Sequence, residues 1–210
     1  MGKKRRLIAT PETLESDLRA CKDAFKRVKI PWVITDGIVL GYARDGAIIP
    51  WDTDMDIAVF VEVSNKKFKF LHRALSENGF RIKKHKKDFM TGGRKSPLNL
   101  WFHHKNGKYY ESFPPSTPKL KFIEKAKWYD NPQLVEFLGS IYPMPNHIED
   151  YLNCRYGHDW KTNIKSDPEE VFLEKKGSRS GGLDWADGPS GKHGKYWPKI
   201  LRRDDTMEEE

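Results

Sequence analysis

Three aspartates occupy alternate positions in the run IPWDTDMDIAVF, directly before a short apolar stretch. They are Asp52, Asp54 and Asp56. In an extended strand, side chains alternate between faces, so the three carboxylates are expected on one face, with neighbours about 6 to 7 Å apart. Carboxylates at this spacing repel one another, and one or two divalent cations relieve the repulsion. Oxygen ligands favour Mg²⁺ or Mn²⁺ over zinc, so the run predicts a magnesium or manganese site.

The aspartate run has two other interpretations. A solvated acidic turn is common for single aspartates, but three alternating ones between Trp51 and an apolar strand would leave charge uncompensated. A calcium-binding EF-hand loop also begins with acids at alternate positions, but it requires Gly at its sixth position and Glu at its twelfth. This chain has Ile57 and Val63 there, so the EF-hand interpretation fails.

A second candidate element, TDGIVLGYARDG, comes shortly before the aspartates. Asp36 and Gly37 form a predicted turn at the start of a short helix, Ile38 to Arg44, where unpaired backbone amides attract phosphate. Arg44 has a planar guanidinium that can bind a phosphate group. Plainer interpretations stay open, because Asp36 can cap the helix, Gly41 can permit close packing, and Arg44 can form a surface ion pair.

Length and composition bound the class of protein. The chain has 210 residues, of which 37% are hydrophobic and 32% charged, which indicates a globular protein with one core. We expect a basic tail and amphipathic helix over 1–30, a catalytic core over 31–165 and a Gly-rich, charged extension over 166–210, peripheral or folded over the site as a flap. The formal charge of +8 favours polyanionic partners. No membrane span or signal peptide is apparent, and Cys21 and Cys154 cannot build a disulfide framework, so a cytoplasmic protein is expected.

Periodicity and turn residues predict the elements that must position these residues. The resulting fold class is α+β, a small mixed β-sheet flanked by helices. The expected elements are a helix from Pro11 to Lys29, a strand at WVIT, a strand from Met55 to Val63, a helix from Lys66 to Asn78, a strand from Phe80 to Lys84, a mobile loop from Asp88 to Pro97, a hairpin formed by LNLWFHH and KYYESF, and a helix at HIEDYLNCRYG that ends at Gly157.

The run WVITDGIVLGYARDGAIIPWDTDMDIAVF resembles the core signature of the LicD and fukutin-related proteins. An Asp-Gly turn, a Leu-Gly step, an arginine and Ile-Pro-Trp-Asp-x-Asp-x-Asp follow in that family's order. LNLWFHHKNGKYYES and YLNCRYGHDW extend the resemblance, which spans about Trp32 to Trp160. It implies a nucleotidyltransferase-like core with Asp52, Asp54 and Asp56 as the metal-binding triplet.

The resemblance also implies an activity: transfer of a phospho-alcohol, such as phosphocholine or ribitol phosphate, from a CDP-linked donor to a sugar or glycan hydroxyl. One departure concerns Asn99, because the family usually has Asp there. Asn99 can still offer a neutral oxygen to a ligand, and Glu111 on the facing strand is a possible substitute. The clustered cysteines and the membrane anchor of some animal relatives are missing from this sequence.

The remaining polar residues give weaker signals. His103 and His104 could act as acid or base, but neighbours in a strand face opposite ways, so at most one can line a cleft. Two lysine groups could bind a polyanion or form a solvated face. They are Lys83, Lys84, Lys86 and Lys87, and Lys119, Lys121, Lys125 and Lys127.

Two rival functions stay open beside phospho-alcohol transfer. A nucleotidyltransferase of the same fold would move a nucleoside monophosphate from ATP or CTP to a nucleic acid, protein or small molecule, and would release pyrophosphate. A non-catalytic relative would bind a phosphorylated glycan or nucleic acid, as Asn99 and the basic surface suggest; nucleic acid is not the favoured partner.

Overall fold

The computed structural model describes residues 9–60, 65–86, 88–113, 120–162 and 199–202 of the chain. The first and last segments of the sequence, and most of the expected extension, lie outside this range. The helices are α1 (Pro11–Val28), α2 (Asp36–Asp45), α3 (Asn65–Glu77), the 3-10 turn η1 (Ala126–Trp128) and α4 (Ile148–Tyr156). The strands are β1 (Trp32–Ile34), β2 (Met55–Phe60), β3 (Arg81–Lys86), β4 (Phe89–Gly93), β5 (Pro97–Asn106), β6 (Tyr109–Ser112), β7 (Leu120–Lys125), β8 (Gln133–Phe137), β9 (Ser140–Met144) and β10 (Lys199–Arg202).

The long strand β5 organises the sheet. Its first part pairs in parallel with β2 on one side and antiparallel with β4 on the other, and its last residues pair with β6. The strand order is therefore β1-β2-β5-β6-β7-β10, with β4 and β3 joined to β5 along its other edge. This mixed sheet with flanking helices confirms the α+β class.

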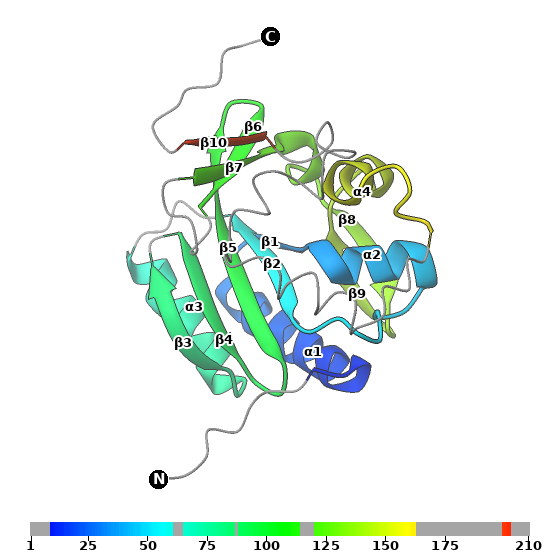
Figure 1. Cartoon of the computed structure of the whole chain (residues 1–210). Coiled ribbons are helices and arrows are strands. Elements are labelled where there is room, and N and C mark those ends of the chain that lie inside the picture. Colours follow the sequence, from blue (N-terminus) through cyan, green and yellow to red (C-terminus); the bar gives the residue numbers. More distant parts are fainter. Residues whose placement is uncertain (1–8, 61–64, 87, 114–119, 163–198, 203–210) are drawn as a thin grey trace, which may run out of the picture.

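The two faces of β2 have different chemistry. Met55, Ile57 and Val59 point into the core, and all three are fully buried. Asp56 points the opposite way, in register with Asn99 of β5. Figure 1 shows α1 and α3 behind the sheet and α2 between α4 and the β8–β9 hairpin. The polar face of β2 therefore lies on the side of the sheet not covered by α1 and α3.

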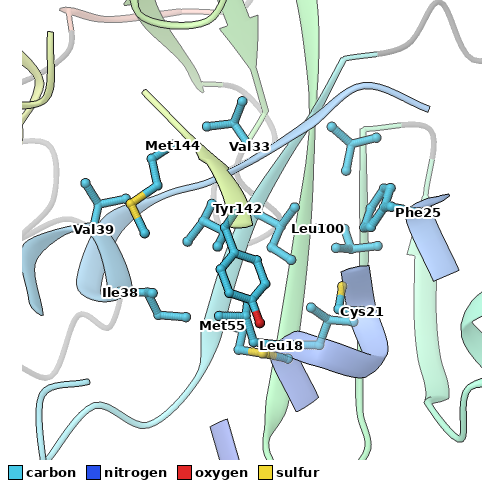
Figure 2. Close-up of a cluster of buried hydrophobic side chains, with 14 of the residues drawn as sticks. Leu18, Cys21, Phe25, Val33, Ile38, Val39, Met55, Leu100, Tyr142 and Met144 are labelled. Carbon is cyan, nitrogen blue, oxygen red and sulfur yellow. The ribbon is translucent and has the colours of Figure 1, made fainter. Parts of the chain in front are cut away.

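The core is built around α1, as its apolar periodicity predicts. Thr10 caps the helix in a capping box with Thr13, and Pro11 occupies the first turn, so the chain begins the helix where the sequence indicates. Figure 2 shows how α1 meets the sheet, α2 and β9. The labelled core residues are Leu18, Cys21, Phe25, Val33, Ile38, Val39, Met55, Leu100, Tyr142 and Met144.

The expectation of a loop over Asp88–Pro97 is wrong, because residues 89–93 form β4 between β3 and β5. The two glycines that indicated a loop lie inside this strand. A Cβ on Gly92 would lie 2.5 Å from the carbonyl oxygen of Arg81 and 2.9 Å from the Cα of Ile82. The β3–β4 register shifts at this point, between Ile82 and Lys84. Glycine is therefore needed here because β3 approaches closely, which is a known role of glycine in strands.

Several other elements agree with the sequence, and some could not be foreseen. The β5–β6 hairpin turns at Asn106 and Gly107, and α4 ends at Gly157, as predicted. Strands β7, β8 and β9 were not foreseen, and neither was β10, which pairs antiparallel with β7 from within the expected C-terminal extension. Among the described residues, no helix combines the length and apolar composition needed to cross a membrane.

Gly92→Ala is expected to lower the free energy of unfolding by about 1 to 3 kcal/mol, because the added methyl forces β3 away from β4. Urea unfolding followed by tryptophan fluorescence measures the change. Thr91→Ala, at the half-buried neighbouring position of β4, is the matched control. Equal unfolding midpoints for Gly92→Ala and the unchanged protein would contradict this account of β4.

Candidate active site

Strand β5 brings two of the three aspartates together. The Asn99 side-chain amide donates to Asp54 Oδ2 at 2.9 Å and to Asp56 Oδ1 at 3.2 Å. Trp101, two residues further along β5, donates its indole N–H to Asp56 Oδ1 at 2.9 Å. These donors face the carboxylates because β2 and β5 run parallel in the register that pairs Asp56 with Asn99. Only Asp56 lies within β2, which begins at Met55.

Asp52 lies in the segment before β2 and packs against the first turn of α2. Its Oδ1 accepts a hydrogen bond from the Thr53 backbone N–H at 2.9 Å. Its Oδ2 is buried and has no hydrogen-bond partner within the described part of the chain. A Cβ on Gly37 would lie 2.5 Å from that oxygen. The absence of a side chain at Gly37 thus makes room for the Asp52 carboxylate, a reason that the sequence alone did not indicate.

Neighbouring carboxyl groups raise the pKa of Asp52 and of Asp56. Burial, the Asp54 carboxylate and Asp36 raise the pKa of Asp52 to about 7, against the hydrogen bonds from Thr53 and Asp54 backbone amides. Burial, Asp36 and Asp54 raise the pKa of Asp56 to about 8, although Trp101 and Asn99 favour the ionised form. Asp36, Asp52, Asp54 and Asp56 therefore form one electrostatically coupled group.

The atom types of this group, carboxylate oxygens, are those that a divalent cation such as Mg²⁺ prefers. The carboxyl and amide groups around Asp56 offer oxygen ligands. In the described part of the chain, one carboxylate oxygen of Asp52 is buried without a hydrogen-bond partner, and burial beside like charge disfavours ionisation. The described residues contain no set of three His, Cys, Asp or Glu side chains arranged closely enough to hold a metal ion. The carboxylates available to hold one are Asp54 and Asp56, joined through Asn99, with Asp52 nearby.

Asp36 is the first residue of α2, but its side chain does not cap the helix. Its carboxylate Oδ1 accepts from Arg155 Nε at 2.7 Å and lies 2.6 Å from Arg155 Nη2. Its backbone N–H donates to the Tyr151 hydroxyl at 3.0 Å. The N-cap is Thr35, which makes no side-chain cap hydrogen bond. Figure 1 shows α4, the source of Tyr151 and Arg155, beside α2.

Arg44 and Gly41 have local roles in the structure. Arg44 Nε lies 3.1 Å from both Asp45 carboxylate oxygens, and its Nη2 lies 2.8 Å from Asp45 Oδ2. The ion-pair interpretation of Arg44 is therefore the observed one, and a role in phosphate binding stays a prediction. A Cβ on Gly41 would collide with the Ala47 carbonyl oxygen and lie 3.1 Å from the Ile49 Cγ1 atom, so Gly41 permits close packing.

The remaining candidates lie away from Asn99. Glu111 stands opposite His104 on the β5–β6 ladder and accepts from Asn106, so it does not substitute for an acid at position 99. His103 is buried against Glu124 of β7, whereas His104 lies near Asp88 on the other face of β5. The opposite orientation of the two histidines agrees with the alternation expected of a strand.

The lysine groups are only partly described. Lys125 and Lys127 both lie beside Asp150, at 3.7 Å and 2.9 Å, and Lys83 is exposed. Side chains of the other lysines proposed for a polyanion surface lie outside the described set. A polyanion surface therefore stays a prediction.

Residues 29–147 match the sequence profile of the LicD/FKTN/FKRP nucleotidyltransferase domain. The α+β core that carries the aspartates is therefore a nucleotidyltransferase-like domain. The matched segment is more than half of the chain, and the protein belongs to the LicD family. This confirms the resemblance in the run from Trp32 to Phe60. No curated protein matches the chain.

Two solved structures of the antibiotic-resistance factor ANT(2'')-Ia have a similar overall fold. The solution structure is 12% identical with a TM-score of 0.48, over 79% of this chain and 83% of that chain. The crystal structure in complex with adenylyl-2"-tobramycin is 12% identical with a TM-score of 0.46, over 77% of this chain and 85% of that chain. These likenesses concern the fold alone.

The free energy of unfolding is expected to fall as the pH rises from about 5 to about 8.5 without metal. The pKa of an aspartate in the unfolded chain is about 4. Folding raises the pKa of Asp52 to about 7 and that of Asp56 to about 8. Between those values the folded state binds more protons, so a higher pH favours unfolding. Urea unfolding at several pH values measures the slope. Asp56→Asn removes one titrating group and should flatten it; an unchanged slope would contradict the coupling.

Gly37→Ala is expected to weaken divalent-cation binding at least tenfold while the fold is retained. The added methyl would displace the Asp52 carboxylate from the first turn of α2. Calorimetric titration with Mn²⁺ measures the affinity, and far-ultraviolet circular dichroism checks the fold. Gly107→Ala, in the β5–β6 turn, is a control away from the site: a Cβ there meets open space, but φ of 57° makes alanine strained, so this variant separates backbone strain from loss of the cation site. Unchanged Mn²⁺ affinity in Gly37→Ala would show that the position of the Asp52 carboxylate does not matter for cation binding.

Proposed function

We propose that this protein is a metal-dependent transferase that moves a phospho-alcohol, of the phosphocholine or ribitol-phosphate type, from a CDP-linked donor to a sugar or glycan hydroxyl. Membership of the LicD family supports the transferase class. The observation that supports a role for this site is the coupled group of buried carboxyl groups beside the first turn of α2. The free thiols Cys21 and Cys154 are in keeping with a cytoplasmic location.

The proposed cofactor is Mg²⁺ or Mn²⁺, for which Asp54, Asp56 and Asp52 would be the ligands. When bound, such a cation neutralises charge on phosphate oxygens. Asp54 and Asp56 are oriented for this role by Asn99, and Trp101 fixes Asp56 further. Their orientation before substrate binding would reduce the reorganisation needed during the reaction.

The first turn of α2 is the proposed phosphate-binding element. The first amides of a helix have no partner within the helix, and the helix dipole favours an anion there. The Asp36 amide already donates to Tyr151, and Thr35 does not cap the turn with its side chain. The amides of Gly37 and Ile38 would therefore bind a donor phosphate oxygen.

The proposed reaction is an in-line displacement at phosphorus. The acceptor hydroxyl oxygen forms a bond to the phosphorus that carries the alcohol, while the bond from that phosphorus to the CMP phosphate oxygen breaks. CMP leaves, and the hydroxyl proton passes to a carboxylate or to water. Asn99 is neutral and cannot take this proton, so its proposed role is to orient Asp54 and Asp56.

The second candidate is transfer of a nucleoside monophosphate from ATP or CTP, which is favoured by the description of the family's domain as a nucleotidyltransferase domain. The same carboxylates and the same first turn would hold a triphosphate. The products differ, because this reaction releases pyrophosphate and the favoured reaction releases CMP.

Incubation of the full chain with Mg²⁺ and either CDP-choline, CDP-ribitol, CTP or ATP distinguishes the candidates. A thermal-shift screen first identifies the nucleotide that stabilises the protein only with Mg²⁺. Chromatography of the products with a panel of sugar acceptors then measures CMP and pyrophosphate. Release of CMP together with transfer of the phospho-alcohol to the acceptor supports the proposal. Release of pyrophosphate supports the second candidate. Binding of nucleic acid that weakens steeply with salt, without turnover, would indicate a non-catalytic protein.

Asp54→Ala and Asp56→Ala are each expected to lower turnover at least a thousandfold, because each removes a carboxylate proposed to hold the cation. The unfolding midpoint should fall little or rise, since a repelling charge is removed from a buried site. Initial rates of CMP release measure the loss. Glu15→Gln, which removes an exposed carboxylate of α1, is the matched control. Full activity in either aspartate variant would exclude this site.

A further inference from the structure

A row of four polar side chains, buried at its inner end and half-buried at its outer end, leads from the interior to the first residue of α2. His103 Nε2 lies 2.7 Å from Glu124 Oε2, and these side chains are only 4% and 2% exposed. Arg155 lies between Glu124 and Asp36, with Nη1 3.6 Å from Glu124 Oε1 and Nη2 2.6 Å from Asp36 Oδ1. The side chains come from β5, β7, α4 and α2, so the row links elements that are far apart in the sequence.

Glu124, near the inner end of this row, is ionised. Burial opposes ionisation of Glu124, but Arg155, His103 and the Tyr129 hydroxyl together lower the pKa of its carboxyl to about 2. His103 Nδ1 lies 3.1 Å from the Trp101 carbonyl oxygen, which can only accept a hydrogen bond. His103 Nε2 faces the ionised carboxylate of Glu124, which also can only accept. Both ring nitrogens of His103 thus face hydrogen-bond acceptors, and Glu124 lies between this ring and the Arg155 guanidinium.

Helix α4 holds Asp36 at two points. The Tyr151 hydroxyl accepts from the Asp36 backbone amide at 3.0 Å, and Arg155, one turn later, binds the Asp36 carboxylate. The Arg155 guanidinium also lies 5.9 Å from the centroid of the Tyr151 ring. Asp36 has φ of 55°, a left-handed conformation that costs a non-glycine residue free energy. The surrounding contacts must therefore maintain it, and α4 provides them.

We propose that Arg155 is a positioning residue for the phosphate-binding turn. Glu124 contacts Arg155 on the side away from Asp36 and holds the guanidinium in place, and Arg155 in turn holds Asp36. The Gly37 and Ile38 amides thereby keep the orientation needed to bind a donor phosphate. Arg155 also neutralises the Asp36 carboxylate, whose negative charge would otherwise repel that phosphate. This role rests on the proposed function for the identity of the ligand.

The chemistry of the site requires arginine. Two nitrogens of one guanidinium meet the same Asp36 oxygen while a third faces Glu124. A lysine ammonium is a compact charge and cannot span both carboxylates in this way. Buried ion pairs add little net stability compared with apolar packing, which favours a role in orientation.

The alternative is that Arg155 only anchors α4. Other contacts already do so: Tyr151 and Leu152 are fully buried, and Asp150 accepts from the Trp128 indole N–H at 2.8 Å and pairs with Lys127 at 2.9 Å. Asp150→Asn weakens this anchor without touching Asp36, so it is a matched control for loosening of α4.

The test compares Arg155→Gln, Arg155→Lys, Asp36→Asn and the Asp36→Asn/Arg155→Gln double variant with Asp150→Asn. Hydrogen exchange reports the Asp36 amide, which donates to the Tyr151 hydroxyl, and calorimetry with Mg²⁺ and pyrophosphate reports phosphate binding. Arg155→Gln should speed exchange of the Asp36 amide and weaken pyrophosphate binding, each at least tenfold, with a smaller loss in Arg155→Lys. Asp150→Asn should change neither the hydrogen exchange nor the pyrophosphate affinity, even if its unfolding midpoint is similar to that of Arg155→Gln. The double variant should bind pyrophosphate no more weakly than Asp36→Asn, because Arg155 acts through Asp36.

The proposal is overturned if Arg155→Gln leaves exchange and binding as in Asp150→Asn, or if the effects in the double variant are additive. If Arg155→Gln does not fold, Asp36→Asn breaks the same ion pair from the Asp36 side. Unchanged hydrogen exchange of the Asp36 amide in Asp36→Asn would then overturn the proposal in the same way. Exchange needs no turnover, so failure of the unchanged protein to release CMP counts against the proposed function alone. If Arg155→Gln still releases CMP and its hydrogen exchange equals that of the unchanged protein, the result counts against the positioning role alone.

Discussion

Repulsion among the carboxyl groups at the start of β2 is the constraint on which the rest of the site depends. Burial and the neighbouring carboxylates raise the pKa of Asp52 and of Asp56, so both carboxyl groups stay neutral up to a higher pH than usual. The protein keeps the group together with donors from separate elements: the Asn99 amide and Trp101 indole from β5, backbone N–H groups around Asp52, and the Arg155 guanidinium from α4. Since none of these donors lies on β2 itself, the sheet and α4 must both form before the site is complete.

The parallel pairing of β2 with β5 follows from this requirement. In that register Asp56 faces Asn99, and Trp101, the next residue of β5 on the same face, still reaches the same carboxylate oxygen. A register shift of one residue would turn these donors to the opposite face of the sheet, where Leu98, Leu100 and Phe102 belong to the core. The apolar core and the polar site therefore specify the same register.

Sequence patterns predicted the parts of the site that are local in the chain, and missed those that are distant. The α+β class, the closeness of Asp54 to Asp56 and a short helix next to Gly37 could be foreseen from such patterns, although the predicted turn at Asp36 and Gly37 is already part of α2. Arg155 lies 119 residues from Asp36, and a single charged residue in a short helix carries no sign of its partner. Arg44 shows the converse: it is close to the aspartates in sequence, yet pairs with Asp45. For β4, the glycines that indicate a loop permit close strand contact instead, which only the tertiary structure reveals.

Asn99 is best understood from the charge balance of the site. A carboxylate at this position would add repulsion to a group whose pKa values are already raised, and it would remove the N–H donors that now join Asp54 and Asp56. An amide therefore lets the two aspartates stay together without help from a cation. Among the described residues, Asp52 has no equivalent donor for its second oxygen, and it lies against Gly37, where the aspartate segment meets the first turn of α2. A charge bound near Asp52 would consequently act on both the carboxylates and the proposed phosphate-binding turn, which makes this contact the point of the fold where cation and phosphate binding would be coupled.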